Sequence, residues 1–149
     1  MKTLVLFYSF SGTTRRWAEA IARTLGADLE EIRTVVPLET KEDLERMQRE
    51  GKPFSVLPPE KDPKDYDRIV LGSPVWAFGL AFPFRTFLKE HRFQGKQVAF
   101  FLSFQAFPGL AGFALKRLLK GNTLMGRRSF KQKETTESQV SAWAETLKR

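Results

Sequence analysis

Short apolar runs alternate along this chain with segments in which apolar residues recur every three or four positions. Residues 3–8 form the first run, and its unbroken apolar character is typical of a strand that helices cover on both faces. Helical spacing begins at Thr14, with Trp17 and Ile21 on its apolar stripe, and ends at Gly26, where a C-cap glycine is expected. The same criteria predict further strands at 27–33, 68–72, 97–103 and 123–130, and helices at 40–50, 84–90, 110–120 and 140–147.

This alternation predicts an α/β fold in a single domain spanning 1–149. The chain has 149 residues, a usual size for one domain, and alternating strands and helices form a parallel sheet with helices on both faces. We expect a doubly wound five-stranded parallel sheet of order 2-1-3-4-5, with a ligand at the switch point between strands 1 and 3. Trp17 and Trp143 lie on apolar helix stripes and are expected in the core. His91, the only histidine, is expected on the surface or as a helix C-cap.

Composition excludes several kinds of chemistry. Cysteine is absent, so disulfides, thiolate metal sites, iron–sulfur clusters and a cysteine nucleophile are excluded. The apolar start of the chain stops at Ser9, which is too short for the core of a signal peptide. No stretch approaches the roughly 20 apolar residues of a membrane span. A cytoplasmic protein without a membrane partner is therefore expected.

Positive charge is concentrated toward the end of the chain. The net charge is +8, and residues 101–149 hold 9 Lys or Arg against 3 acidic residues. Such an excess indicates either a docking face for an acidic partner or nucleic acid, or a solvated basic surface. No nucleic-acid motif accompanies the charge, so a nucleic-acid partner is not expected.

The first predicted strand runs directly into a loop suited to an anion. The loop is Ser9-Phe10-Ser11-Gly12-Thr13-Thr14, and a helix follows it. The first turn of a helix has backbone N–H groups without partners and carries the positive end of the macrodipole. Gly12 lets the backbone approach a phosphate, and four hydroxyls add donors. The alternative is an ordinary turn in which Thr13 or Thr14 caps the helix. Neither a Walker A loop nor a Gly-x-Gly-x-x-Gly motif occurs.

Two loops resemble those of the flavodoxin family, specifically its short single-domain members. The Ser-x-Ser-Gly-x-Thr pattern is similar to that family's phosphate loop for flavin mononucleotide (FMN), and residues 72–79 with Pro83 resemble its second flavin loop. By the same resemblance, residues 103–109 would form the third flavin loop. The resemblance implies a flavodoxin-like fold and FMN as cofactor, with Trp76 in the loop around Pro74 stacking on the flavin. Phe78 and Phe107 fit either stacking or core packing. The implied FMN-binding residues are Ser9, Phe10, Ser11, Gly12, Thr13, Thr14, Pro74, Val75, Trp76, Ala77, Phe78, Gly79, Ser103, Phe104, Gln105, Phe107 and Gly109.

Three functions remain open at this stage. The first is an electron carrier between protein partners, with an acidic redox partner indicated by the basic surface. The second is a small FMN-dependent NAD(P)H/quinone-type oxidoreductase. The third is a non-redox basic interaction module on the same fold. No catalytic residue and no metal ligand are indicated, because the flavin would carry the redox chemistry. Residues 72–84 and residues 103–115 contain no charged side chain. The negative charge of a fully reduced flavin would therefore be less destabilised than in an acidic flavodoxin.

Overall fold

The computed structural model describes residues 1–51, 53–76 and 79–148. The strands are β1 (Thr3–Phe7), β2 (Asp28–Glu31), β3 (Arg68–Trp76), β4 (Gly79–Leu80), β5 (Gln97–Phe104) and β6 (Thr123–Lys131). The helices are α1 (Thr13–Leu25), α2 (Lys41–Glu50), α3 (Phe82–Glu90), α4 (Ala111–Leu118) and α5 (Glu137–Glu145), with 3₁₀ turns at Pro63–Asp65 and Thr146–Lys148. Across these residues, no helix combines the length and apolar character needed to span a membrane.

Five strands form a parallel sheet in the order β2-β1-β3-β5-β6. Counted without the two-residue β4, this is the predicted order 2-1-3-4-5, and the predicted fold class is confirmed. β4 is the unexpected element. It pairs antiparallel with the end of β3, Val75 opposite Leu80 and Trp76 opposite Gly79.

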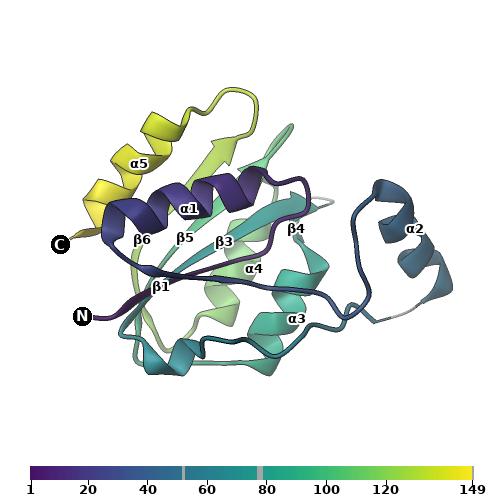
Figure 1. The fold of residues 1–149 in the computed structure, drawn as a ribbon, viewed down its shortest axis with the longest axis horizontal. Helices are drawn as coiled ribbons and strands as arrows, with labels where there is room; N and C mark the ends of the chain where they lie inside the picture. Colours follow the sequence, from purple (N-terminus) through teal and green to yellow (C-terminus); the bar gives the residue numbers. More distant parts are fainter. Residues whose placement is uncertain (52, 77–78, 149) are drawn as a thin grey trace.

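Helices cover both faces of the sheet, which explains why the strands are apolar throughout. α1 and α5 lie side by side on one face, and α3 and α4 lie on the other (Figure 1). In β1, Val5 and Phe7 pack in the α1/α5 core, whereas Leu4 and Leu6 pack in the α3/α4 core. Successive strand residues point to opposite faces, so every position of β1 after Thr3 is buried.

Several element ends differ from the sequence predictions. β3 continues to Trp76 instead of ending at residue 72, because Ser73 and Pro74 keep pairing with β5 and the last two residues pair with β4. β2 and α4 are shorter than predicted, and α3 begins two residues earlier, with Pro83 in its first turn. Trp17 and Trp143 are buried, as expected. His91 is the C-cap of α3, where its N–H donates to the Phe87 carbonyl.

Candidate functional site

The carboxyl ends of β1, β3 and β5 meet at one edge of the sheet, and a cleft of about 550 Å³ lies there. All three predicted loops contribute to its lining: Phe10 and Ser11 from the first, Pro74, Val75 and Trp76 from the second, and Phe104, Gln105 and Phe107 from the third. This volume lies within the range of about 300–1,000 Å³ usual for ligand pockets. Ala77 and Phe78 lie outside the described residues.

The first loop presents the start of α1 beside this cleft. Gly12 is the N-cap and adopts the left-handed conformation, with φ of 94°. The interpretation of Thr13 or Thr14 as the cap is therefore wrong. The Ser9 hydroxyl oxygen accepts hydrogen bonds from the N–H groups of Gly12 (3.1 Å) and Arg15 (3.2 Å), which holds the loop in a tight turn.

The remaining donors of this turn are available to a ligand. In the described part of the chain, the N–H groups of Ser11, Thr13 and Thr14 have no hydrogen-bond partner. A Cβ placed on Gly12 would have no heavy atom within 4 Å apart from atoms of the turn itself. Unpaired N–H groups at the positive end of a helix, beside a glycine that leaves room for a ligand, form an arrangement that accepts a phosphate.

Two predicted site residues bind each other. The hydroxyls of Thr14 and Ser103 are 2.9 Å apart and buried, joining the first loop to the end of β5. Nearby, the Arg15 guanidinium forms an ion pair with Glu31 of β2. These two links hold the start of α1 against the ends of β5 and β2. The contacts of Thr14 and Ser103 with a cofactor stay a prediction.

Trp76 lies at the end of β3, in the hairpin with β4, and not in the middle of a loop. Its ring is nearly perpendicular to those of Tyr8, Phe10 and Phe82, with centroid distances of 5.6, 5.5 and 5.6 Å. Edge-to-face packing of this kind fixes the indole in one orientation. Burial raises the pKa of Tyr8 well above its ordinary value, and the negative charge of Glu31 adds to the rise. The phenol beneath Trp76 therefore stays neutral.

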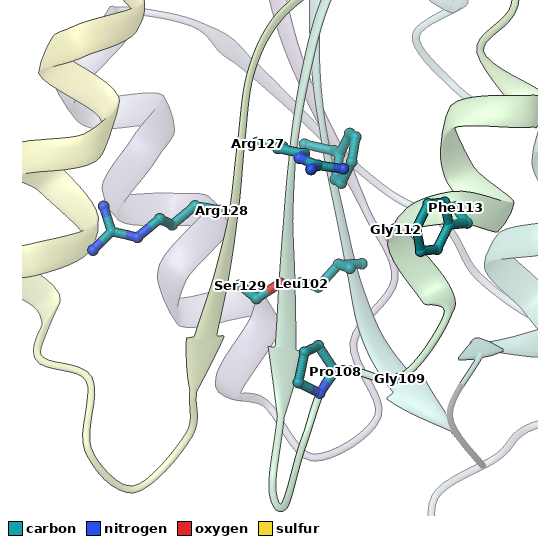
Figure 2. A pocket seen from close by; sticks show the side chains of 9 residues that line it. Leu102, Pro108, Gly109, Gly112, Phe113, Arg127, Arg128 and Ser129 are labelled. Atoms are coloured by element: carbon teal, nitrogen blue, oxygen red, sulfur yellow. The ribbon is translucent and has the colours of Figure 1, made fainter.

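The remaining predicted residues lie around the cleft rather than in its lining. Ser9, Gly12 and Thr13 form the turn described above, and Gly79 pairs with Trp76. Gly109 lines a second hollow, of about 440 Å³, between α4 and β6 (Figure 2).

Phe107 is 54% exposed and lines the main cleft, so it does not belong to the core.

Sequence reasoning missed one wall of the cleft. α2 contributes Lys41, Leu44, Glu45 and Gln48, and the segment after β6 contributes Gln132. The strongly polar composition of this helix is typical of a solvent-exposed helix and does not indicate that it borders a ligand site. The signal that could have found it is topological: α2 follows β2 and Gln132 follows β6, and the carboxyl ends of parallel strands lie at the same edge of the sheet as the cleft.

Comparisons with known proteins agree with this geometry. The family model described as flavodoxin matches residues 2–147. The chain belongs to the flavodoxin family. A flavoprotein from Lactobacillus acidophilus, solved in complex with FMN, is 26% identical, with a TM-score of 0.72 over 96% of this chain and 98% of that one. Flavodoxin 2 from Bacillus cereus, solved in its oxidised form, is 22% identical, with a TM-score of 0.68 over 99% and 97%. Comparison with curated protein sequences gives no match.

This member of the flavodoxin family has few charges in its cleft. Among the residues that line it, only Lys41 and Glu45 are charged, within the described part of the structure. Both come from α2 and they carry opposite signs. The walls supplied by the first, second and third loops are uncharged, as the sequence indicated.

Proposed function

We propose that this chain binds FMN in the cleft and acts as an electron carrier between protein partners. The observation that supports the proposal is the junction of two features at Ser11. This residue lines the aromatic cleft and also belongs to the turn whose N–H groups have no partner among the described residues. A ligand with a flat aromatic system at one end and a phosphate at the other fits both parts at once. The FMN complex of the Lactobacillus acidophilus relative supports the same ligand.

The chain's own residues have distinct parts in this proposal. The N–H groups of Ser11 and Thr13 would hold the phosphate, each hydrogen bond to a charged group contributing about 1.5–3 kcal/mol. Trp76 and Phe107 would supply apolar walls, and Gln105 and Gln132 would supply amide groups for the polar edge of the flavin. When bound, FMN supplies the electron-transfer chemistry, and the protein orients it and limits its contact with water.

The proposal is tested by the visible spectrum of the purified protein before and after addition of FMN. We expect flavin absorbance and a dissociation constant that rises about tenfold or more in Trp76→Ala, because aromatic stacking contributes about 0.5–1.5 kcal/mol beyond burial. Trp76→Phe is the matched control and retains most of the affinity. A protein that retains no flavin absorbance after excess FMN is removed would contradict the proposal and favour the non-redox module.

The same preparation separates a carrier from an enzyme. A carrier exchanges electrons with other proteins and does not by itself turn over NAD(P)H. Steady-state reduction of a quinone by NAD(P)H with the purified protein alone would show that the oxidoreductase alternative is correct. The exposed aromatic ring of Phe107 beside the cleft is the feature that favours this second candidate, since a flat acceptor could pack on it.

The reduction potential provides a further prediction. We expect the second-electron potential of the bound flavin to be higher than in acidic flavodoxins, because the loops around the cleft carry no carboxylate to oppose a negatively charged reduced flavin. Lys41→Glu should lower this potential by tens of millivolts, and Lys41→Gln should lower it less. Spectroelectrochemical titration measures both effects. A wild-type potential as low as that of the acidic carriers would show that the cleft charges do not set it.

A further inference from the structure

One long segment of the chain carries positive charge only. Residues 91–133 contain no Asp or Glu and hold nine Lys or Arg. The segment forms β5, α4 and β6, so its charge lies at one side of the sheet, from the third cleft loop to the edge strand. Where such charges gather on one surface, they create a field that attracts partners of the opposite sign.

The exposed side of α4 joins apolar and basic residues into one surface. Leu110 and Phe113 are 68% and 67% exposed, Lys116 and Arg117 lie in the last turn of α4, and Lys120 follows two residues after its end. Together these five residues line a shallow groove of about 540 Å³, and we call them the α4 face. Exposed large apolar side chains gathered in one place are typical of a protein contact, since scattered ones are the norm on a free surface.

Arg127 adds a cation across the hollow from α4. It pairs with Phe100 in the sheet register, which places it on the sheet face that α4 covers. Figure 2 shows Arg127 on the α4 side of β6 and Arg128 pointing away toward α5. Considering only residues that the structure describes, Lys116, Arg117, Lys120 and Arg127 make no ion pair with an acidic side chain. Their charges are therefore not neutralised within the chain.

The α4 face begins where the cleft ends. Phe107 lines the cleft, Pro108 and Gly109 line the hollow beside it, and Leu110 is the first residue of the α4 face. A partner that covers Leu110 and Phe113 would therefore lie next to the cleft. For an electron carrier this closeness matters, because electrons pass only between cofactors brought near each other.

We propose that the α4 face docks an acidic protein that exchanges electrons with this chain. The proposal rests on the function proposed above and adds the partner's chemistry: carboxylates around an apolar patch, which would meet the lysines and arginines around Leu110 and Phe113. An apolar and aromatic centre with a charged rim is the usual organisation of a protein–protein interface. A nucleic-acid interface is more polar and relies on phosphate contacts, which Leu110 and Phe113 do not serve.

The test uses the full chain and a small acidic haem protein, the soluble domain of cytochrome b5, as the probe. Association is measured by calorimetry at low ionic strength, and electron transfer from the photoreduced protein is measured by stopped flow. We expect K116E/R117E to weaken association and slow electron transfer at least about tenfold, because removing complementary charge reduces both steering and affinity. Phe113→Ser, which keeps every charge, should weaken association as well.

The control variant is K64E/K89E, which changes the net charge equally. Both control residues are exposed and lie at the opposite edge of the sheet from the cleft, Lys64 just before β3 and Lys89 near the end of α3. We expect the control to stay within about twofold of wild type at moderate salt, where distant charges are screened. FMN absorbance should be the same in all variants.

Three results would overturn the docking proposal: no association with the haem protein, equal effects of the two charge-reversed variants, or binding only to vesicles of anionic phospholipid or to duplex DNA. Failure of the proposed function looks different. A protein that does not take up FMN would refute the carrier role, while the calorimetric comparison of the variants would still show whether the α4 face binds an acidic protein.

Discussion

Replacing Thr13 by Asp is expected to weaken FMN binding by about 100-fold while leaving riboflavin binding nearly unchanged. Thr13 is the first residue of α1, and its N–H is one of the unpaired donors of the turn. A carboxylate at this position would repel a phosphate and displace it from a charge-assisted hydrogen bond, for a combined cost of about 3 kcal/mol. Riboflavin lacks the phosphate and would not sense the charge.

The same substitution should not harm the protein without FMN. An acidic residue in the first turn of a helix interacts favourably with the macrodipole, by about 0.3–1 kcal/mol, and α1 has no acidic residue there. Ligand affinity and the free energy of unfolding therefore change in opposite directions, which separates a phosphate contact from a folding defect. Thr13→Asn is the matched control, since it has nearly the same shape without the charge.

Flavin fluorescence titration measures both affinities, and denaturant unfolding measures the stability of the protein without FMN. If Thr13→Asp lowered the affinities for FMN and riboflavin equally, the turn would not be the phosphate site. If Thr13→Asn caused the full loss, the side chain's shape and not its charge would be responsible.

Gly72→Ala is expected to destabilise the fold by about 3 kcal/mol. Gly72 lies in β3 opposite Phe101 of β5, and a Cβ at this position would meet the Phe101 ring at 2.2 Å. The ring is fully buried and packs against Phe130 and Trp143, so it has little room to move. Overpacking of a core typically costs about 1–3 kcal/mol, and the upper end applies where the neighbour is confined.

The chain offers a matched control for this change. Gly112 lies in α4 with open space around its Cβ position, so Gly112→Ala should raise stability by about 0.5–1 kcal/mol through the higher helix propensity of alanine. Chemical denaturation of both variants without FMN measures the difference. In the double variant G72A/F101L, the loss should be smaller than the sum of the single losses. A Gly72→Ala protein as stable as wild type would show that β3 and β5 separate easily.

The loop geometry shows how much local sequence can predict. The apolar run of β1, the helical stripe of α1 and the glycine between them depend on neighbouring residues, and each was predicted from spacing alone. The capping box at the start of α2 is equally local, because the Thr40 hydroxyl accepts from the Asp43 N–H only three residues away. Because these features need only contacts a few positions apart, their residues suffice to specify them.

The composition of the cleft depended on longer-range contacts. Thr14 and Ser103 are 89 positions apart, and only the adjacent placement of their loops lets their hydroxyls meet. Trp76 is held by rings from β1, the first loop and α3, and its extended conformation depends on pairing with β4. Helix and strand periodicity gives no information about contacts between residues so far apart in the sequence.

The sequence by itself therefore determined the fold class, the strand order and the turn at the start of α1. Tertiary structure alone decided that α2 walls the cleft, that Gly109 turns into the hollow beside β6, and that Leu110 and Phe113 stay exposed among cations. The physical reason is the range of the interactions. Helix hydrogen bonding, capping and the periodicity of helices and strands depend on near neighbours in the sequence, whereas a binding surface is made where distant segments pack together.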